Sequence, residues 1–384
     1  MRILLSCLQS LRQHGVPPYD FWRQYFVEGC REANIECVEV PGVDWAEGLT
    51  YPAGAELIAW RARTWERVLE FVRKARAHQP LDLFLGYLFP TQVDPAAISE
   101  LQRLGLPCVN FFCDNVRQFR EVPEVYRPFS LHWVPEFEAL PMYRRAGLPH
   151  EHAPMPCWVP PSFRNVPEIE TEPPTFIGSA DILRRDLLGR ALEAGAELVI
   201  RGPGWEPSPK PERGKGQGLG GRLRNQIETV QTQGWRTLAH KVSNRLRPLR
   251  PPDIPASVLG PFLSKDEHTR VTREAVVTIG INRVPKIGVS LRRPQTYSRL
   301  RDIEAPMLGA CYLTEWTEGL GELYELGIEI ETYRTPEELV VKLDRLQKDP
   351  VYRRTLRGRA QRRALADHSV ARSLGQIAAR LVGN

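Results

Sequence analysis

Two residues in segment 294–309 have types and a spacing that could bind a ligand, Arg301 and Glu304. A carboxylate on the buried face of a helix is costly unless a partner binds it. The arginine three residues earlier could supply that partner as an internal ion pair. Alternatively, the carboxylate could accept hydrogen bonds from the vicinal hydroxyls of a ligand while the arginine contacts an attached phosphate.

A helix must position this pair, and the sequence predicts one that starts near Pro294 and ends at Gly309. At 100° per residue Glu304 falls inside the apolar stripe, whereas Asp302 is expected on the opposite, solvated side. The stripe itself consists of Leu300, Ile303, Met307 and Leu308.

A glycine-containing turn follows the next predicted strand, at 311–315. Glu318, Gly319 and Leu320 would open another helix, whose free backbone N–H groups could bind an anion. In a parallel sheet, the helix of 294–309 and this turn should meet at the same edge. We therefore expect a carboxylate that binds a diol beside a turn that binds phosphate.

Together these elements read LRDIEAPMLGACYLTEWTEGLGELYELGIEIETYRTPEEL, which resembles the nucleotide-sugar-binding half of the GT-B glycosyltransferases. The segment is most similar to the CgeB-like spore-maturation branch of the group-1 type. This resemblance implies that Glu304 holds the ribose of a nucleoside-diphosphate sugar, beside Arg301, and that residues 318–320 form the phosphate-facing loop. It covers about 174–369 and is absent between about 207 and 255. Many retaining members carry a further glutamate where this chain has Thr296, so the role of that glutamate cannot be carried over.

Further donor-binding residues are expected at the first turn of the second half. Gly178 and Ser179 end a predicted strand, and Arg184 and Arg185 lie in the first turn of the following helix. Some related glycosyltransferases keep a basic residue here for the diphosphate. Either arginine could equally be solvated.

Inversion at the anomeric centre would need a base near the acceptor hydroxyl. The candidates are His14, in the loop after the first strand, and Asp114, at the end of PCVNFFCD. Their alternatives are a surface histidine and an aspartate that caps the turn before Asn115. The sequence contains no D-x-D motif, so we expect a metal-independent reaction with no cofactor.

Strands and helices alternate in both halves, which indicates an α/β protein. We expect the GT-B fold, with two Rossmann-like, doubly wound domains facing a cleft. Residues 1–158 would hold the acceptor, 159–174 form a proline-rich linker, and 175–369 bind the nucleotide sugar. A basic insertion occupies 207–255, and the resemblance implies that a helix in 370–384 crosses back to the first domain.

Residues 210–250 contain ten basic residues against two glutamates, and apolar residues that include a tryptophan recur among them at helical spacing. Such a segment could lie on an anionic membrane surface, or it could pack on its own domain. No nucleic-acid binding is expected, because aromatic residues for stacking are nearly absent. Seven cysteines without a CxxC pair, and no apolar run of 18 residues, predict a reduced cytoplasmic protein. If the basic segment lies on a membrane, the protein would be peripheral to its inner face.

The resemblance therefore implies a glycosyltransferase of the hexosyl type. It would move a sugar from a nucleoside-diphosphate sugar to a glycan, lipid-linked or protein acceptor, for example in a cell-envelope polysaccharide. Two alternatives remain open, namely a nucleotide-sugar epimerase on the same fold and a non-catalytic protein that binds the nucleotide or a membrane surface.

Overall fold

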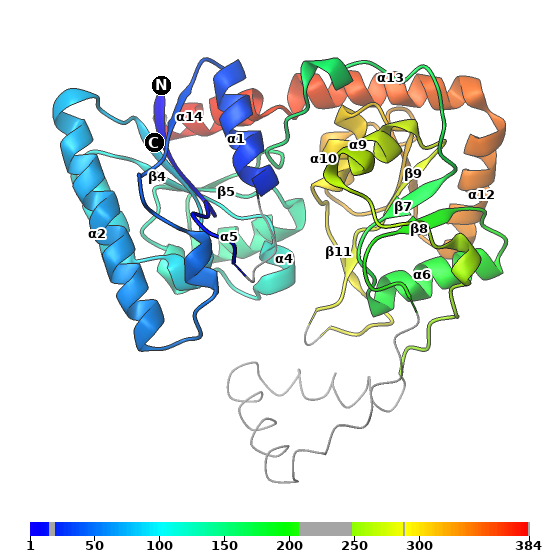
Figure 1. Ribbon diagram of the computed structural model, residues 1–384, viewed down its shortest axis with the longest axis horizontal. Coiled ribbons are helices and arrows are strands. Elements are labelled where there is room, and N and C mark those ends of the chain that lie inside the picture. Colours follow the sequence, from blue (N-terminus) through cyan, green and yellow to red (C-terminus); the bar gives the residue numbers. More distant parts are fainter. Residues whose placement is uncertain (15–19, 207–247, 287–288, 383–384) are drawn as a thin grey trace, which may run out of the picture. The chain divides into compact units, whose positions relative to one another are not determined.

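The computed structural model describes residues 1–14, 20–206, 248–286 and 289–382 of the chain (Figure 1). The chain divides into two compact units. The first contains 1–161 together with 362–384, and the second contains 162–361. Most of the basic segment 210–250 lies outside the described residues. None of the helices in the described ranges is long and apolar enough to cross a bilayer.

A six-stranded, all-parallel sheet forms the centre of the first unit, in the order β2-β1-β3-β4-β5-β6. Its strands are β1 (Arg2–Cys7), β2 (Glu36–Val38), β3 (Leu83–Tyr87), β4 (Cys108–Phe111), β5 (Leu131–Trp133) and β6 (His150–Glu151). Strands β1, β3, β4 and β5 are almost entirely buried. This is typical of a sheet covered on both faces, because neither set of alternating side chains meets water.

Helices cover both faces of this sheet. Helices α2 (Ala55–His78) and α3 (Pro95–Arg103) pack apolar side chains against Leu4 and Phe84 on one face. On the other face, α1 (Asp20–Glu32) places Trp22 and Phe26 edge-on against the aromatic rings of β3, β4 and β5. Helix α14 (Val370–Val382) packs beside α1, so the last helix of the chain belongs to the first unit (Figure 1). Two short helices, α4 (Asn115–Gln118) and α5 (Leu140–Ala146), follow β4 and β5.

A five-stranded parallel sheet, in the order β13-β12-β9-β7-β8, forms the centre of the second unit. Its strands are β7 (Thr175–Ile177), β8 (Val199–Arg201), β9 (Thr278–Gly280), β12 (Tyr312–Glu315) and β13 (Glu331–Tyr333). Its helices are α6 (Ile182–Glu193), α9 (Lys265–Glu274), α10 (Arg301–Met307), α11 (Leu320–Leu323), α12 (Pro336–Lys348) and α13 (Pro350–Asp367). Both units are therefore doubly wound α/β domains, as predicted.

The predicted helix start at Pro294 is wrong. Residues 295 and 296 instead form β11 (Gln295–Thr296), which pairs antiparallel with β10 (Arg283–Val284). Because Thr296 is committed to this ladder, the helix begins only at Arg301. The helix that carries Arg301 and Glu304 is therefore about half as long as expected.

Two arginines of the arginine-rich helix α13 are buried. Arg353 and Arg357 of α13 are only 7% and 1% exposed. Arg357 donates to the carbonyl oxygens of Arg273, Ala275 and Gly309, and both arginines pair with Glu170. Burial is tolerated here because the planar guanidinium can satisfy most of its donors at once.

Candidate functional site

Arg301 and Glu304 lie together on the first turns of α10, as predicted. A guanidinium nitrogen of Arg301 lies 3.5 Å from a carboxylate oxygen of Glu304, and the side chains are 25% and 15% exposed. Arg301 also donates to Nε2 of His268 at 2.7 Å and to the hydroxyl of Thr272 at 3.3 Å. The arginine is thus held by α9 as well as by its neighbour on α10.

His268 is neutral at physiological pH. Its pKa is lowered to about 4, mainly by the positive charge of Arg301 and then by burial, although Glu304 opposes the shift. The neutral ring can accept the hydrogen bond from Arg301 through Nε2. Sequence analysis missed this histidine. The available signal was the i,i+4 spacing of His268 and Thr272, which puts both on one face of α9.

Asp302 is completely buried, which contradicts its predicted position on a solvated face. Its carboxylate accepts hydrogen bonds from the backbone N–H of Arg299 at 2.8 Å, the Tyr312 hydroxyl at 2.8 Å and the Thr314 hydroxyl at 3.0 Å. Burial raises the pKa of Asp302, and these hydrogen bonds partly offset the increase. Asp302 therefore fixes the start of α10 to β12, and with it the positions of Arg301 and Glu304.

A second buried carboxylate organises the ends of β9 and β12. Glu315 accepts from the backbone N–H groups of Asn282 and Arg283 at 3.1 and 2.9 Å. It also pairs with the guanidinium of Arg283 at 2.6 Å. Both residues follow β9, and the ion pair holds the carboxyl ends of these adjacent strands together.

The turn at Glu318, Gly319 and Leu320 opens a helix, as predicted, but that helix, α11, has only four residues. The expected free N–H groups are engaged. Those of Leu320, Gly321 and Glu322 donate to carbonyl oxygens three residues earlier, at 3.2, 3.3 and 3.2 Å. Hydrogen bonds that span three residues satisfy the first N–H donors of a short helix, and they tighten the turn. An anion here would have to compete with these hydrogen bonds.

Arg184 and Arg185 brace the turns after β7 and β8. Arg184 donates to the carbonyl oxygen of Ser179 at 2.8 Å and pairs with Asp181, the N-cap of α6, at 3.3 Å. Arg185 donates to the carbonyl oxygen of Gly204 and lies 5.4 Å from the ring centre of Trp205. Both guanidinium groups are therefore anchored at this edge of the sheet.

The backbone of Gly178 makes a close contact with the turn after β8. Its carbonyl oxygen lies against Gly202, which has φ +128°, so a Cβ at Gly202 would overlap that oxygen. The two turns after β7 and β8 can approach this closely because Gly202 carries no Cβ.

In the first unit, His14 is buried and paired, so its alternative as a surface histidine is wrong. Its Nε2 lies 2.8 Å from the carboxylate of Asp44, and each side chain is 6% exposed. Asp44 also accepts from the backbone N–H groups of Leu11 and Glu47, both at 2.9 Å. Sequence analysis missed Asp44, which follows the second strand and lies 30 residues from its partner.

Asp114 precedes α4, but its side chain accepts no capping hydrogen bond there, so the simple capping role is wrong. Its charge acts on a buried neighbour, Glu136, whose pKa is raised by burial and then by Asp114. One carboxylate oxygen of Glu136 accepts from the backbone N–H of Val116 at 3.2 Å. The partner that the structure gives to His14 is Asp44, so the two predicted catalytic residues belong to different clusters.

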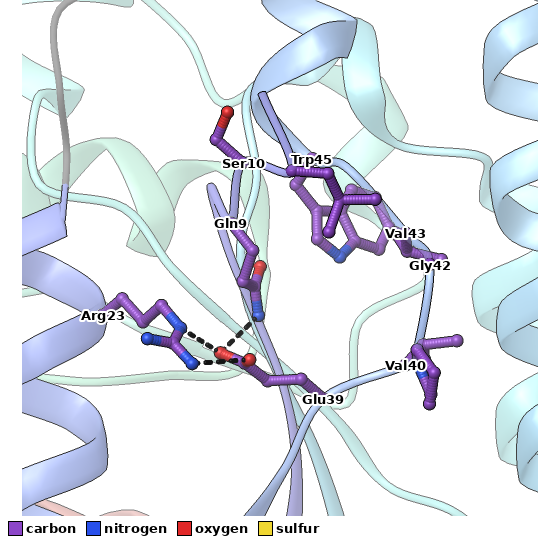
Figure 2. A pocket seen from close by; sticks show the side chains of 10 residues that line it. Gln9, Ser10, Arg23, Glu39, Val40, Gly42, Val43 and Trp45 are labelled. Atoms are coloured by element: carbon purple, nitrogen blue, oxygen red, sulfur yellow. Dashed lines mark hydrogen bonds and ion pairs between the residues drawn. The ribbon is translucent and has the colours of Figure 1, made fainter. Parts of the chain in front are cut away.

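Two adjoining cavities lie beside the His14–Asp44 pair, and both are lined by residues 11, 42 and 43. The larger has a volume of about 410 Å³. In its wall, Glu39 receives a bidentate ion pair from Arg23 at 2.6 and 2.9 Å and a hydrogen bond from Gln9 at 3.1 Å (Figure 2). The smaller has a volume of about 280 Å³, and Asp44 is part of its wall.

Comparison with known proteins identifies the second half of the chain. Residues 184–379, just over half of the sequence, match a family described as glycosyl transferase-like. No curated protein matches the sequence significantly.

Several solved structures share the fold over the whole chain. A structure of Alr3699/HepE from Anabaena in complex with UDP and glucose is 14% identical, with a TM-score of 0.57 and 100% of both chains covered. Sucrose-phosphate synthase from Thermosynechococcus elongatus is also 14% identical, with a TM-score of 0.55 over 100% of this chain and 99% of that one. AviGT4, a glycosyltransferase of avilamycin A biosynthesis, is 14% identical, with a TM-score of 0.53 over 100% of this chain and 98% of that one.

At such low identity the structural likeness establishes only the fold, which is GT-B, with two Rossmann-like domains. The family match extends from the first helix of the second unit into α14 and includes the pair on α10. The chain is therefore a member of the glycosyl transferase-like family and adopts the GT-B fold.

Proposed function

We propose that the protein transfers a sugar from a nucleoside-diphosphate sugar to a hydroxyl of an acceptor. The observation that carries this proposal is the placement of Glu304, a partly exposed carboxylate on a short helix that buried Asp302 fixes to the sheet. Solved structures of HepE contain UDP or UDP-glucose, which makes UDP-glucose the first donor to test.

The donor would bind to the second unit. The carboxylate of Glu304 would accept hydrogen bonds from the ribose hydroxyls, and Arg301, fixed by His268, would hold that carboxylate in position. The diphosphate would lie near Gly178 and Ser179 and near the turn 318–320. The guanidinium groups of Arg184 and Arg185 at this edge of the sheet would stabilise the departing diphosphate without a metal ion.

The acceptor would bind to the first unit, beside His14 and Asp44. The Asp44 carboxylate can only accept a hydrogen bond, so Nε2 of His14 carries a proton and donates this bond at 2.8 Å. This tautomer makes Nδ1 the basic nitrogen, which is suited to take a proton from an acceptor hydroxyl. Asp114 is the second candidate for this role.

The anomeric configuration of the product separates two roles for this pair. Inversion would require a base and would assign His14 that role. Retention would leave the pair to bind and orient the acceptor hydroxyl. Proton NMR of the product formed from UDP-glucose distinguishes these outcomes directly.

Donor binding by Glu304 can be tested by calorimetry with UDP-glucose. Glu304→Gln removes the charge and should weaken binding roughly tenfold or more, because a charge-assisted hydrogen bond contributes about 1.5–3 kcal/mol. Glu193→Gln is a matched control, since Glu193 is exposed at the carboxyl end of α6. Equal affinity in the wild type and Glu304→Gln would refute the proposed donor site, and loss of binding in EDTA would refute metal independence.

We further propose that the acceptor is a glycan, a lipid-linked molecule or a protein reached at a membrane surface. Support comes from the composition of 210–250, with ten basic residues against two glutamates. Flotation with anionic liposomes should be lost when residues 210–250 are deleted. Unchanged flotation would remove the membrane from the proposal and leave sugar transfer unaffected.

A further inference from the structure

One face of α2 lines the smaller cavity in the first unit. Trp60, Arg63, Thr64 and Arg67 recur at positions i, i+3, i+4 and i+7, so their side chains project from the same side of the helix. Trp60 and Thr64 are buried, whereas Arg63 and Arg67 are exposed. The cavity thus has an aromatic and hydroxyl floor with cationic groups at its rim.

The carboxylates of this cavity already have partners. Glu47 pairs with Arg12 at 2.8 Å and accepts from the Tyr51 hydroxyl at 2.6 Å. Asp44 is occupied by His14 and by two backbone N–H groups. With Arg12, Arg63 and Arg67 against Asp44 and Glu47, the wall of this cavity carries one more cation than carboxylates.

The other two arginines have no acidic partner among the residues that the structure describes. Arg67 donates to the carbonyl oxygen of Gly42 at 2.8 Å, and this acceptor carries no net charge. Within the described part of the chain, neither Arg63 nor Arg67 takes part in an ion pair. Two guanidinium groups one helical turn apart thus face a cavity with an excess of positive charge.

We propose that this cavity binds an oxyanion of the acceptor, either a phosphate or a carboxylate. The proposal rests on the proposed function, because it describes the acceptor of that same reaction. Arg63 and Arg67 would contact the oxyanion through their planar forks, which match its geometry. Asp44 places the anion site next to His14, so the bound group would hold an acceptor hydroxyl near that ring.

The adjoining cavity suits the uncharged part of the same acceptor. Its charged residues, Arg23 and Glu39, neutralise each other, and Gln9 and Ser10 add an amide and a hydroxyl to its wall (Figure 2). Such groups recognise sugar hydroxyls and have no preference for a net charge. The two cavities together therefore describe an acidic or phosphorylated sugar as the class of acceptor.

Binding of simple probes tests this at constant ionic strength. The wild type should bind glucose 6-phosphate and glucuronate, and should bind glucose at least tenfold more weakly. The double variant Arg63→Gln/Arg67→Gln should lose roughly tenfold or more of the affinity for both anionic sugars. Arg76→Gln, which removes a cation from the last turn of the same helix, should change neither affinity.

Vesicles of phosphatidylglycerol and of phosphatidylcholine distinguish the source of the anion. If only the anionic vesicles bind, and the double variant releases them, the oxyanion belongs to a lipid headgroup. If the soluble sugars bind and the vesicles do not, the anion belongs to a sugar.

Equal binding of every probe by the wild type and the double variant would overturn the inference, and so would absence of binding to all of them. UDP-glucose affinity, measured on the same samples, should stay unchanged in the double variant. Donor binding without any anion preference would reject the acceptor class alone. Absence of donor binding in the wild type would reject the proposed function itself.

Discussion

Replacing Arg301 by glutamine should raise the pKa of His268. The positive charge of Arg301 is the largest cause of the low value of about 4, and burial is the second. Removing the charge therefore moves the pKa upward, while burial keeps it below the ordinary 6.5. Each pKa unit recovered corresponds to about 1.4 kcal/mol of differential stabilisation of the imidazolium.

The same shift sets a pH dependence of stability. The pKa of His268 is lower in the folded protein, so between pH 6.5 and about 4 the unfolded chain binds the proton first. Stability in this range falls as the pH falls, by up to about 3 kcal/mol in total if the whole 2.5-unit difference is realised. Below pH 4 this histidine adds no further loss. Arg301→Gln should flatten the slope.

Two-dimensional NMR of the histidine ring Cε1–H signals between pH 3.5 and 8 measures this pKa, and His268→Gln assigns the signal. Arg270→Gln is the control, because Arg270 lies on the same helix but pairs with Glu172 and Glu274. We expect an upward shift of about one unit or more in Arg301→Gln and none in Arg270→Gln. An unchanged pKa in Arg301→Gln would refute the described contact between α9 and α10.

Three other perturbations address the scaffold and the acceptor side. Asp302→Ala should lower the free energy of unfolding in urea by about 3 kcal/mol or more, because it leaves buried hydroxyl groups unpaired; a loss below 1 kcal/mol would contradict the anchoring role. Gly202→Ala should destabilise by about 2 kcal/mol or more, clearly exceeding Gly195→Ala, since both glycines have positive φ but only Gly202 meets a carbonyl oxygen. Asp44→Asn should slow sugar transfer by roughly 10²–10⁴ with donor affinity unchanged, and full activity would exclude a catalytic histidine pair.

Local patterns were sufficient to predict much of the fold. Buried strands alternate with amphipathic helices in both halves, as the sequence predicts. The pairing of Arg301 with Glu304 also followed from spacing, because residues three apart on a helix are neighbours whatever the tertiary structure.

Other features depend on contacts between distant segments and could not be predicted this way. Asp302 is buried because hydroxyl groups from β12 donate hydrogen bonds to it. The periodicity of a helix does not predict the position of that strand. His14 finds Asp44 across 30 residues, in a loop whose shape is set by backbone bonds to the same carboxylate. Thr296 forms a strand because it pairs with Arg283, and this pairing overrides the residues that favour a helix start.

The late position of α13 and α14 in the chain constrains the order in which the protein can mature during synthesis. In the second unit Arg357 of α13 donates hydrogen bonds to three backbone carbonyl oxygens, and in the first unit α14 packs beside α1. A nascent chain emerges from its amino end, so neither unit can complete these contacts until α13 and α14 have left the ribosome. Premature termination would therefore yield two incomplete domains instead of one finished domain and one fragment.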